Sequence, residues 1–447
     1  MTDRPVYRYV PYFGYPQDLP TASGEPLTVV LDATDPHAFD RLWGMTLLER
    51  NLRTVERLGG RHLHLLVRPA DAARARRRRF EATCTPALHP VEGDPGAALR
   101  ALAGSVPGPV LLLDAAAFYD RRLVAALWQH PAPAVAVAGD QLLGAPAVLL
   151  AGRDLAALSP APAASLADLA RSCLALGGVQ RFDLLGIGSR VSLLRKNVPA
   201  RVIPVRSRAD LREADAHLKA LAGKGVNDLV GEFVHPPIEF LLTRLAARTP
   251  LTPNQISYLI ILLSLAGLYY FAVGQLWVGI AINLVRGVAD GVDGKLARLT
   301  MRESKAGNLL DHGTDTVYLP LLFLALGWGL SQGDPLSAPA IVTGVLQGFY
   351  WLNRVLASWF KLFFGVDESE FRPIDRAVRR IYPKRNIFIL MMILAMLIGR
   401  PAVGLYATTA LTVGFTLYRL ARLDYEGRRL RRAGGPPAAA GPGNGRP

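Results

Sequence analysis

The sequence predicts a soluble α/β domain in its first half and an α-helical membrane domain with six transmembrane helices in its second half. Three observations lead to this fold class. Short aliphatic runs recur through residues 1–226, and long apolar stretches follow from residue 253 onward. Hydrophobic residues make up 51% of the 447 residues, with a mean hydropathy of +0.22. This share is high for a wholly soluble protein, so we expect part of the chain in lipid.

The net charge narrows the class of partner. The formal charge is +15 and the isoelectric point is about 10.1, which suits either nucleic acid or an anionic membrane. Much of the basic excess flanks the apolar stretches. We therefore expect membrane lipids as partners and no nucleic acid.

Cysteine usage and the N-terminus predict a cytoplasmic first half. Cys84 and Cys173 lie far apart without a CxxC spacing, which supports neither a disulfide framework nor a zinc site. The first residues contain no apolar run of the length that a signal peptide requires. A reducing compartment fits both observations.

Residues 1–226 have the pattern of a mostly parallel sheet with crossover helices. Their aliphatic runs are as short as buried strands, and stretches of helical pattern separate them. The runs begin at Leu27, His62, Pro109, Ala134 and Ala147.

Residues 227–252 form the junction. Apolar residues recur there at helical spacing, and Arg244 and Arg248 lie near the end. This predicts an amphipathic juxtamembrane helix along the membrane surface. A linker helix packed on the soluble domain is the alternative.

Residues 253–427 contain six stretches that we interpret as transmembrane helices. Several approach the roughly 20 residues needed to cross a bilayer. The second and third reach that length only by including parts of an aspartate-rich stretch between Asp290 and Asp315. The six stretches are centred on residues 256–274, 276–289, 316–330, 338–359, 387–399 and 402–418.

Loop charge predicts the orientation, because Lys and Arg accumulate in cytoplasmic loops. The loop from Arg372 to Arg385 and the segment from Arg428 to Arg432 are strongly basic, whereas the opposite connections carry almost no base. Both termini and the aspartate stretch are therefore expected on the cytoplasmic side of the cell membrane. The tail, residues 428–447, is predicted to be disordered from its Pro- and Gly-rich composition.

Four aspartates at the ends of apolar helices need an explanation, since a charged side chain at the centre of such a helix costs about 2.5–3.5 kcal/mol to insert. On ideal helices Asp290 and Asp293 share one face, and Asp311 and Asp315 lie one turn apart on the next helix. Carboxylates this close repel unless cations neutralise them. Hard divalent ions such as Mg²⁺ or Mn²⁺ prefer such oxygen ligands, and a pair of them is a recurrent device of phosphoryl transfer.

Three further residues in the stretch suit a phosphate-bearing substrate. Gly294 and Gly307 lie on or beside the acidic faces and leave room for a substrate, and Arg298 offers a planar fork of donors. We therefore expect a phosphorylated substrate held by metal ions at the membrane surface.

The stretch resembles, without a gap, the signature DxxDGxxARx₈GxxxDxxxD of the CDP-alcohol phosphotransferases. The "TPNQIS" segment at Thr252 is similar to the family's entry segment, and six spans is the family's usual number. The resemblance covers about residues 230–425. The matching residues are Asp290, Asp293, Gly294, Ala297, Arg298, Gly307, Asp311 and Asp315.

This resemblance implies an activity and a set of roles. The family transfers a substituted phosphate from a CDP-linked donor, such as CDP-diacylglycerol or a CDP-polar alcohol, to an alcohol acceptor and releases CMP. It implies that the four aspartates ligate two divalent ions and that Asp315 is also the base for the acceptor hydroxyl. Gly294, Ala297, Arg298 and Gly307 would line the CDP site. A phospholipid or its precursor as product and a homodimer are further implications.

Two other interpretations of the aspartates remain: helix caps in ordinary loops, and a membrane ion pathway. The acceptor is also open. Arg354, Lys361 and the basic loop 372–385 suit either a phosphorylated acceptor or anionic lipid. The fused architecture resembles enzymes of inositol phosphates and related polar alcohols, while glycerol phosphate and serine remain alternatives.

Three segments of the first half carry a resemblance: "TLLERNLRTVERLGGRHLHLLVR" from Thr46, "VLLLDAAAFYDRRLVAAL" from Val110 and "VIPVRSRADLREADAHL" from Val202. Through them the first half resembles a degenerate nucleotidyltransferase, a Rossmann-like fold. The family's glycine-rich loop is missing, because no glycine follows the first strand before Gly44. Ala116 stands where the family has a metal-binding aspartate, and Arg206 stands where an acidic residue is usual. We expect this domain to be catalytically inactive, with a scaffolding, dimerising or regulatory role. A bifunctional cytidylyltransferase and phosphotransferase is the alternative.

Overall fold

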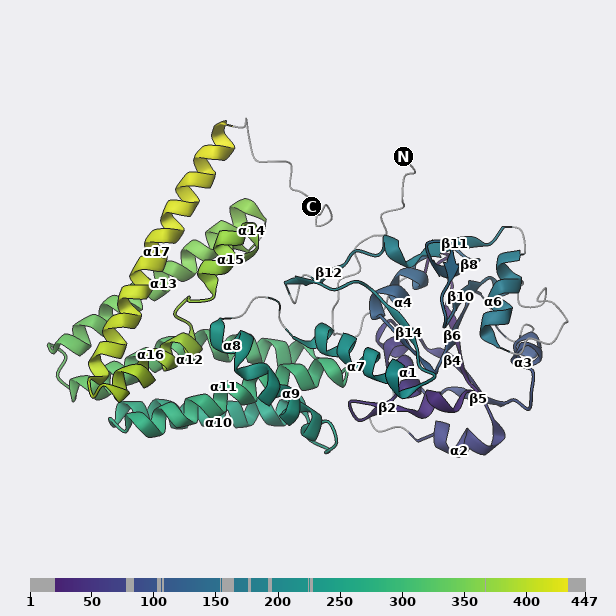
Figure 1. The fold of residues 1–447 in the computed structure, drawn as a ribbon, viewed down its shortest axis with the longest axis horizontal. Helices are drawn as coiled ribbons and strands as arrows, with labels where there is room; N and C mark the ends of the chain where they lie inside the picture. Colours follow the sequence, from purple (N-terminus) through teal and green to yellow (C-terminus); the bar gives the residue numbers. More distant parts are fainter. Residues whose placement is uncertain are drawn as a thin grey trace. The chain divides into compact units, whose positions relative to one another are not determined.

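The computed structural model divides the chain into two compact units, one up to Gly223 and the other mostly from Lys224 onward (Figure 1). The predicted boundary at residues 226 and 227 falls outside the described residues. The structure describes residues 21–77, 84–102, 106, 108–152, 154, 165–175, 178–191, 195–223, 225, 228–365 and 367–432.

The N-terminal unit is built on an eight-stranded sheet, counted over the described residues. The strand order is β11-β8-β10-β6-β1-β4-β5, and β9 pairs with β8. The strands are β1 (Thr28–Ala33), β4 (His62–Val67), β5 (Ala87–Pro90), β6 (Val110–Asp114), β8 (Ala134–Ala138), β9 (Gln141–Leu142), β10 (Ala147–Leu150) and β11 (Gln180–Asp183).

The prediction of a mostly parallel sheet is confirmed. β1 is parallel to β4 and β6, β4 to β5, and β8 to β11. β10 is an exception, because it runs antiparallel to both β6 and β8. The connection from Ala138 to Ala147 is too short for a crossover helix, so the chain returns in the opposite direction.

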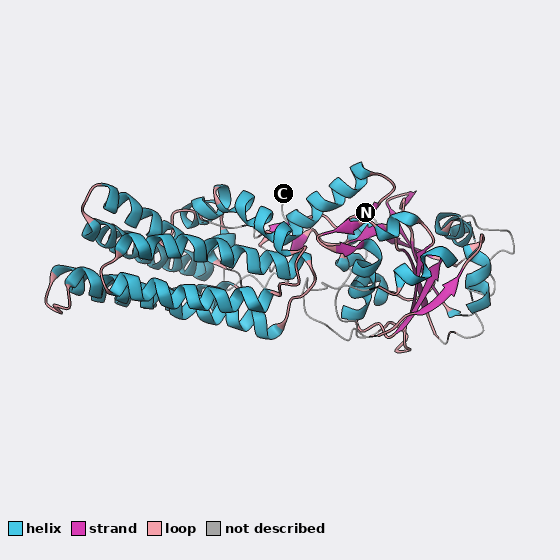
Figure 2. Cartoon of the chain, turned by 90° about the horizontal axis from the view of Figure 1, so that it is seen from below, coloured by secondary structure: helices cyan, strands magenta, loops and turns pink. Residues whose placement is uncertain are grey.

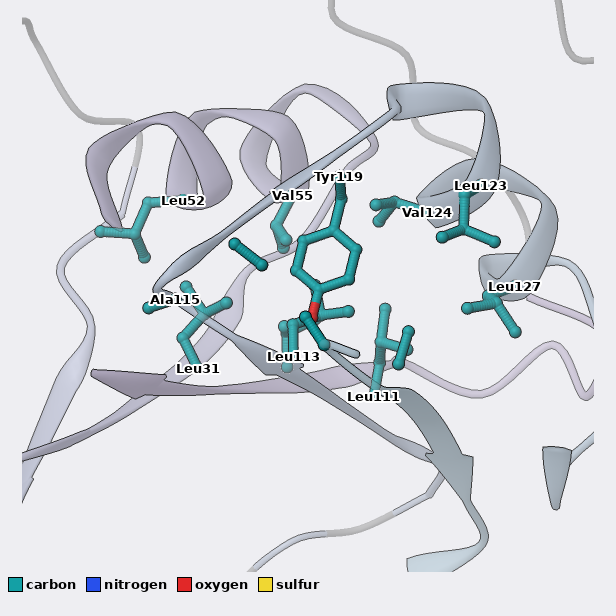
Figure 3. Close-up of a cluster of buried hydrophobic side chains, with 14 of the residues drawn as sticks. Leu31, Leu52, Val55, Leu111, Leu113, Ala115, Tyr119, Leu123, Val124 and Leu127 are labelled. Atoms are coloured by element: carbon teal, nitrogen blue, oxygen red, sulfur yellow. The ribbon is translucent and has the colours of Figure 1, made fainter. Parts of the chain in front are cut away.

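Helices cover both faces of this sheet. One face packs against α1 (Leu47–Arg57) and α4 (Arg121–Trp128), and the other against α3 (Pro95–Leu102) and α6 (Leu166–Ala175). Figure 3 shows the first layer, where Tyr119 lies among leucines of β6, α1 and α4. Burial raises the pKa of Tyr119, and its hydroxyl donates to the carbonyl of Pro146 at 2.9 Å.

Shorter elements complete this unit. Among them, β14 pairs antiparallel with β7 and brings the segment around Arg206 beside the end of β6. The remaining elements are β2 (Arg41–Leu42), β3 (Met45–Thr46), α2 (Ala72–Ala75), β7 (Ala117–Tyr119), β12 (Arg190–Val191), β13 (Lys196–Asn197), β14 (Val202–Pro204), α7 (Arg208–Ala222) and 3₁₀ turns at Pro36–Phe39, Pro69–Asp71 and Leu184–Gly186.

The C-terminal unit is helical, and each of the six predicted apolar stretches lies in a helix. The long helices lie side by side (Figure 2). They are α10 (Pro253–Ala272), α11 (Leu276–Leu299), α12 (Lys305–Ser331), α13 (Ala338–Phe364), α16 (Arg385–Leu397) and α17 (Pro401–Arg432), with short helices α8 (Leu229–Phe233), α9 (His235–Ala246), α14 (Glu368–Phe371) and α15 (Pro373–Arg379).

Within the described residues, α10 and α12 are long and apolar enough to cross a membrane. Within the structure, 33% of the apolar window of each of these two helices is buried. The bundle has an aromatic and aliphatic core around Phe271, Phe323 and Phe388, yet it exposes many large apolar side chains on its outer face, such as Trp351 and Trp359. Large exposed apolar surfaces mark membrane or protein contact in folded proteins.

Two predicted segments, the juxtamembrane helix and the tail, differ from the structure. The juxtamembrane stretch is two helices, α8 and α9, because Pro236 and Pro237 at the start of α9 lack the N–H groups that a continuous helix needs. The tail begins later than predicted, since α17 is helical to Arg432. An ion pair between Arg428 and Asp424, one turn apart at 2.9 Å, supports this extra turn. Residues 433–447 lie outside the described residues.

Asp120 holds the first turn of α4 in place. It is fully buried, caps the helix through the N–H of Arg122 and pairs with the Arg122 guanidinium at 2.7 Å. Burial alone would raise the pKa of Asp120, but the His217 ring 3.6 Å away and the hydrogen bonds from Arg122 outweigh it and lower the pKa from 3.8 to about 2. This stabilisation is therefore complete above pH ~4 and is lost as the pH falls towards 2.

We expect Asp120→Ala to destabilise the N-terminal unit by about 3–5 kcal/mol, because it leaves Arg122 buried without its carboxylate. Native-state hydrogen exchange of peptides from α4 and α7 measures this change. Asp168→Ala is the control, since Asp168 and Arg171 form an exposed pair at 2.6 Å, and exchange should stay unchanged. Equal exchange in the two variants would contradict the structural role of Asp120.

Candidate functional site

The predicted motif occupies the second half of α11 and the first half of α12. Asp290 and Asp293 lie on α11, and Asp311 and Asp315 lie on α12. Ser304 caps α12, and its hydroxyl accepts a hydrogen bond from the N–H of Gly307 at 3.0 Å. The side chain of Asp311 lies outside the described residues.

Hydrogen bonds and ion pairs draw four helices together around the other three aspartates. Arg286 of α11 donates to Asp315 of α12 at 2.9 Å. Ser257 of α10 donates to Asp293 at 2.5 Å. Arg385, at the start of α16, lies 3.4 Å from Asp290. The Arg286–Asp315 pair therefore joins the helices that carry the two halves of the motif.

The three aspartates differ in access. Asp293 is buried, with 9% of its surface exposed, and the side chain of Asp290 is 22% exposed. The side chain of Asp315 is 51% exposed. Among these three carboxylates, Asp315 is the one most open to a substrate.

Arg298 lies against Gly294, one turn earlier on α11. A Cβ atom at residue 294 would lie 3.1 Å from Nη2 and 3.3 Å from Nη1 of Arg298. The glycine thus leaves room for the guanidinium group. Ala297 precedes Arg298, and its carbonyl accepts a hydrogen bond from the N–H of Arg302 at 2.8 Å as the helix ends. That Gly294, Ala297, Arg298 and Gly307 line a CDP site stays a prediction.

The donor set fits a hard divalent cation, since it consists of carboxylate oxygens. Within the part of the chain whose side chains are described, no group of three or more His, Cys, Asp or Glu side chains lies close enough to hold a metal ion. Asp311 lies outside that part. The metal-ligand roles of Asp290, Asp293, Asp311 and Asp315 therefore stay a prediction.

Two partners of the aspartates were missed from the sequence. Ser257 carries no sequence signal that sets it apart from other serines in an apolar helix. Arg286 does carry one, because it is the charged residue within the second apolar stretch and stands one turn before Asp290. A charge in that position requires a partner.

Three arginines of the basic loop between α13 and α16 form ion pairs. Arg372 pairs with Glu426 at 2.5 Å, and Arg380 pairs with Glu232 at 2.9 Å. Arg385 faces Asp290, as described above. Arg354, on α13, donates to Thr316 at 3.2 Å, next to Asp315. Among the predicted anion-binding residues, Arg385 therefore contacts the motif, and Arg354 contacts the residue that follows it.

Helix α9 packs on the motif helix through a buried ion pair. Glu239 accepts a hydrogen bond from Lys295 and lies 3.4 Å from Nδ1 of His235, and all three side chains are buried. Gly291 makes this possible, because a Cβ atom there would lie 1.9 Å from Oε1 of Glu239. The opposite face of α9 exposes Ile238, Leu241, Leu242 and Leu245. The polar face of α9 is thus turned inward and the apolar face outward.

In the N-terminal unit, a guanidinium group lies among carboxylates at the ends of β1 and β6. Arg206 pairs with Asp114, lies 3.4 Å from Asp35 and donates to the carbonyl of Ala116 at 3.3 Å. Burial would lower the pKa of Arg206, but Asp114 raises it, so the arginine stays charged. Burial raises the pKa of the neighbouring Asp32. The positive charge that neutralises Asp114 and Asp35 is therefore the guanidinium group of Arg206.

A family model matches part of the helical unit. The model named CDP-alcohol phosphatidyltransferase matches residues 250–418. These residues form a CDP-alcohol phosphatidyltransferase domain. The match confirms the family suggested by the motif and covers all six long helices, apart from the last turns of α17.

A curated relative matches a longer part of the chain than this domain. It is the bifunctional IPC transferase and DIPP synthase of Rubrobacter xylanophilus, 29% identical over 259 residues, which cover 57% of this chain and 53% of the relative. The chain thus spans about half the length of the curated relative it matches. The aligned residues outnumber those from residue 250 to the C-terminus, so the match extends into the region before the CDP-alcohol phosphatidyltransferase domain.

Two kinds of solved structure are similar to parts of the chain. Phosphatidylinositol phosphate synthase of Mycobacterium tuberculosis with CDP-DAG bound is 19% identical, with 41% of this chain and 92% of that chain covered and a TM-score of 0.33. The inositol-1-phosphate CTP transferase of T. maritima is 12% identical, with 43% and 96% covered and a TM-score of 0.33.

We expect Gly291→Ala to destabilise the CDP-alcohol phosphatidyltransferase domain, although alanine is the better helix former by about 1 kcal/mol. The added methyl would displace Glu239 and leave Lys295 buried without its partner. The melting temperature in detergent should fall by several degrees, because each kcal/mol shifts it by about 2–4 °C in a domain of this size.

Gly348→Ala is the matched control for this substitution. It lies on α13, where nothing lies within 4 Å of an added Cβ atom, so its melting temperature should hold or rise. If the two alanine variants melt alike, α9 is not held through Glu239.

Proposed function

We propose that the protein is an integral membrane CDP-alcohol phosphotransferase of phospholipid biosynthesis. It transfers a substituted phosphate from a CDP-linked donor to an alcohol acceptor and releases CMP. The observation that carries this proposal is the complete signature on α11 and α12, with the Arg286–Asp315 ion pair joining its two halves. The family match over residues 250–418 supports it.

In the proposed reaction the acceptor oxygen attacks the phosphorus atom that carries the substituent, and the bond from that phosphorus to CMP breaks. Asp315 takes the proton of the acceptor hydroxyl, which suits its half-exposed carboxylate. Arg298, beside Gly294, binds the phosphates of the CDP group. Ala297 and Gly307 line the same site and keep it free of bulk.

Asp290, Asp293, Asp311 and Asp315 would hold two divalent ions, Mg²⁺ or Mn²⁺. Bound there, the ions would polarise the transferred phosphate and lower the pKa of the acceptor hydroxyl. The all-carboxylate donor set supports this assignment. Ser257 orients Asp293 by its hydrogen bond, and Arg385 orients Asp290.

For the substrates, we favour a phosphorylated polar alcohol of the inositol type as acceptor, and CDP-diacylglycerol or a CDP-polar alcohol as donor. The relative's name, which contains IPC transferase and DIPP synthase, supports an inositol-phosphate-type product. Arg354 donates to Thr316, the residue after Asp315, and Arg385 lies 3.4 Å from Asp290, so both suit an acceptor phosphate.

The membrane arrangement follows the same proposal. Six spans, both termini and the site on the cytoplasmic side of the cell membrane, and a homodimer are proposed from the loop charges and the family. The inverted amphipathicity of α9, apolar outside and charged inside, supports its place along the membrane surface.

The name of the relative also favours a second activity, the cytidylyltransferase step of a bifunctional enzyme. For this chain we propose that the N-terminal domain is inactive in that step. Arg206 already neutralises Asp114 and Asp35 at the carboxyl ends of the strands. A divalent ion bound to these carboxylates would have to displace a charged guanidinium group.

We expect Asp315→Asn to reduce CMP release to a small residual rate while the protein still folds and binds its CDP-linked donor. The amide cannot accept the acceptor proton, so a loss of at least about 10³-fold is expected from removal of a general base and metal ligand. The measurement is CMP release in a screen of donors and acceptors. Asp334→Asn, in the exposed turn between α12 and α13, should retain full activity.

Full turnover by Asp315→Asn would remove its role as base. Ion flux in liposomes without any CMP release would instead favour the membrane ion transporter.

For the N-terminal domain, we expect no pyrophosphate from CTP, Mg²⁺ and inositol 1-phosphate or other sugar phosphates. The physical reason is that Arg206 holds the carboxylates that a catalytic ion would need. The full-length protein is assayed for pyrophosphate, with CMP release from a CDP-linked donor as proof that the preparation is active. Clear production of pyrophosphate would establish the bifunctional alternative.

A further inference from the structure

Arg286 is a fully buried cation in the middle of α11. Its exposed surface is 0%, which is unusual for any arginine and more so in an apolar helix. Breaking the pairing of a buried charge costs about 3–5 kcal/mol, so such a residue persists only with well-placed partners.

Two neighbouring helices supply these partners. The Nε atom of Arg286 donates to the Ser264 hydroxyl of α10 at 2.7 Å, and Nη2 donates to Oδ1 of Asp315 at 2.9 Å. The guanidinium plane lies over the ring of Tyr318, with its carbon 4.0 Å from the ring centre. Lysine could not make these contacts at once, because it lacks the planar fork.

The partners are themselves held in place. The Ser264 hydroxyl donates to the carbonyl of Ile260 at 2.7 Å, and the Tyr318 hydroxyl donates to Asn283 at 2.6 Å. Gly267 leaves the space for the second pair, since a Cβ atom there would lie 2.9 Å from Asn283 and 3.1 Å from Tyr318. The guanidinium group therefore has a fixed position between α10, α11 and α12.

The Arg286–Asp315 pair is asymmetric. The arginine side chain is 1% exposed, whereas the Asp315 side chain is 51% exposed. Moreover, Nη1 of Arg286 is buried without a hydrogen-bond partner among the described residues. A buried polar group without a partner costs about 1–3 kcal/mol, so stability alone does not account for this arginine.

We propose that Arg286 is a positioning residue, which fixes the orientation of the Asp315 carboxylate for proton transfer. This inference rests on the proposed function of Asp315 as base. A half-exposed aspartate on a helix surface has more than one rotamer accessible to it, whereas a general base must hold its geometry to within about 0.5 Å. Arg286 restrains the carboxylate from its buried side and leaves the exposed side to the substrate.

The test compares Arg286→Gln with the wild-type protein in the CMP-release assay. We expect kcat to fall about 10- to 100-fold, the scale on which misplacement of a reacting group acts, while KM for donor and acceptor changes less than about twofold. Arg286→Lys should recover only part of kcat. Arg400→Gln, an exposed arginine between α16 and α17, is the control and should leave both constants unchanged.

A second measurement separates positioning from a general structural effect. In a double-mutant cycle, Arg286→Gln added to Asp315→Asn should lower the residual CMP release no further, because the arginine acts through the aspartate. The same cycle on melting temperatures in detergent should show coupling between the two residues. Additive losses in both measurements would overturn the proposal.

If Arg286→Gln does not fold, Ser264→Ala decides the question, since it removes the contact at Nε without changing charge. We expect about a 3- to 10-fold loss of kcat at unchanged KM, from partial release of the arginine. Unchanged kcat in a folded Arg286→Gln or Ser264→Ala variant overturns the positioning role alone. Absence of CMP release from the wild-type protein overturns the proposed function, and this inference with it.

Discussion

A guanidinium group inside an apolar helix bundle must have a partner, and in this protein the partner of Arg286 is the carboxylate of Asp315. That requirement ties α11 to α12, and through Ser264 it ties both to α10. The same rule operates at Glu239 and Lys295, which join α9 to the motif helix. These contacts hold α9, α10 and α12 against the motif helix α11, so pairing of buried charge shapes the site.

The elements were largely predictable from the sequence, because their signals are local. The aliphatic runs at Leu27, His62 and Pro109 became the parallel strands β1, β4 and β6, and the six apolar stretches became helices. The antiparallel β10 was not predicted, since strand direction depends on the length of a connection. The break before α9 had a local signal in Pro236 and Pro237, which the helical spacing of the neighbouring apolar residues obscured.

The site was predictable to the level of the motif and no further. The spacing placed Asp290, Asp293 and Asp315 on two successive helices, as found. It did not indicate which side chain would contact each carboxylate, because Ser257 lies more than 30 residues before Asp293 and the contact arises only from helix packing. Arg286 could have been found from the cost of burying its charge. The sequence could not show that Arg286 pairs with Asp315 rather than with Asp290, which is nearer to it in the sequence.

The contact between Gly291 and Glu239 links two positions that lie far apart in the chain. An acid at 239 requires a residue without a side chain at 291, and a small apolar residue at 239 removes that requirement. Among relatives, the two positions should therefore vary together. Position 291 is the first position that the signature leaves open to any residue. Its identity in a relative would then indicate whether the juxtamembrane helix packs through an ion pair or through apolar contacts.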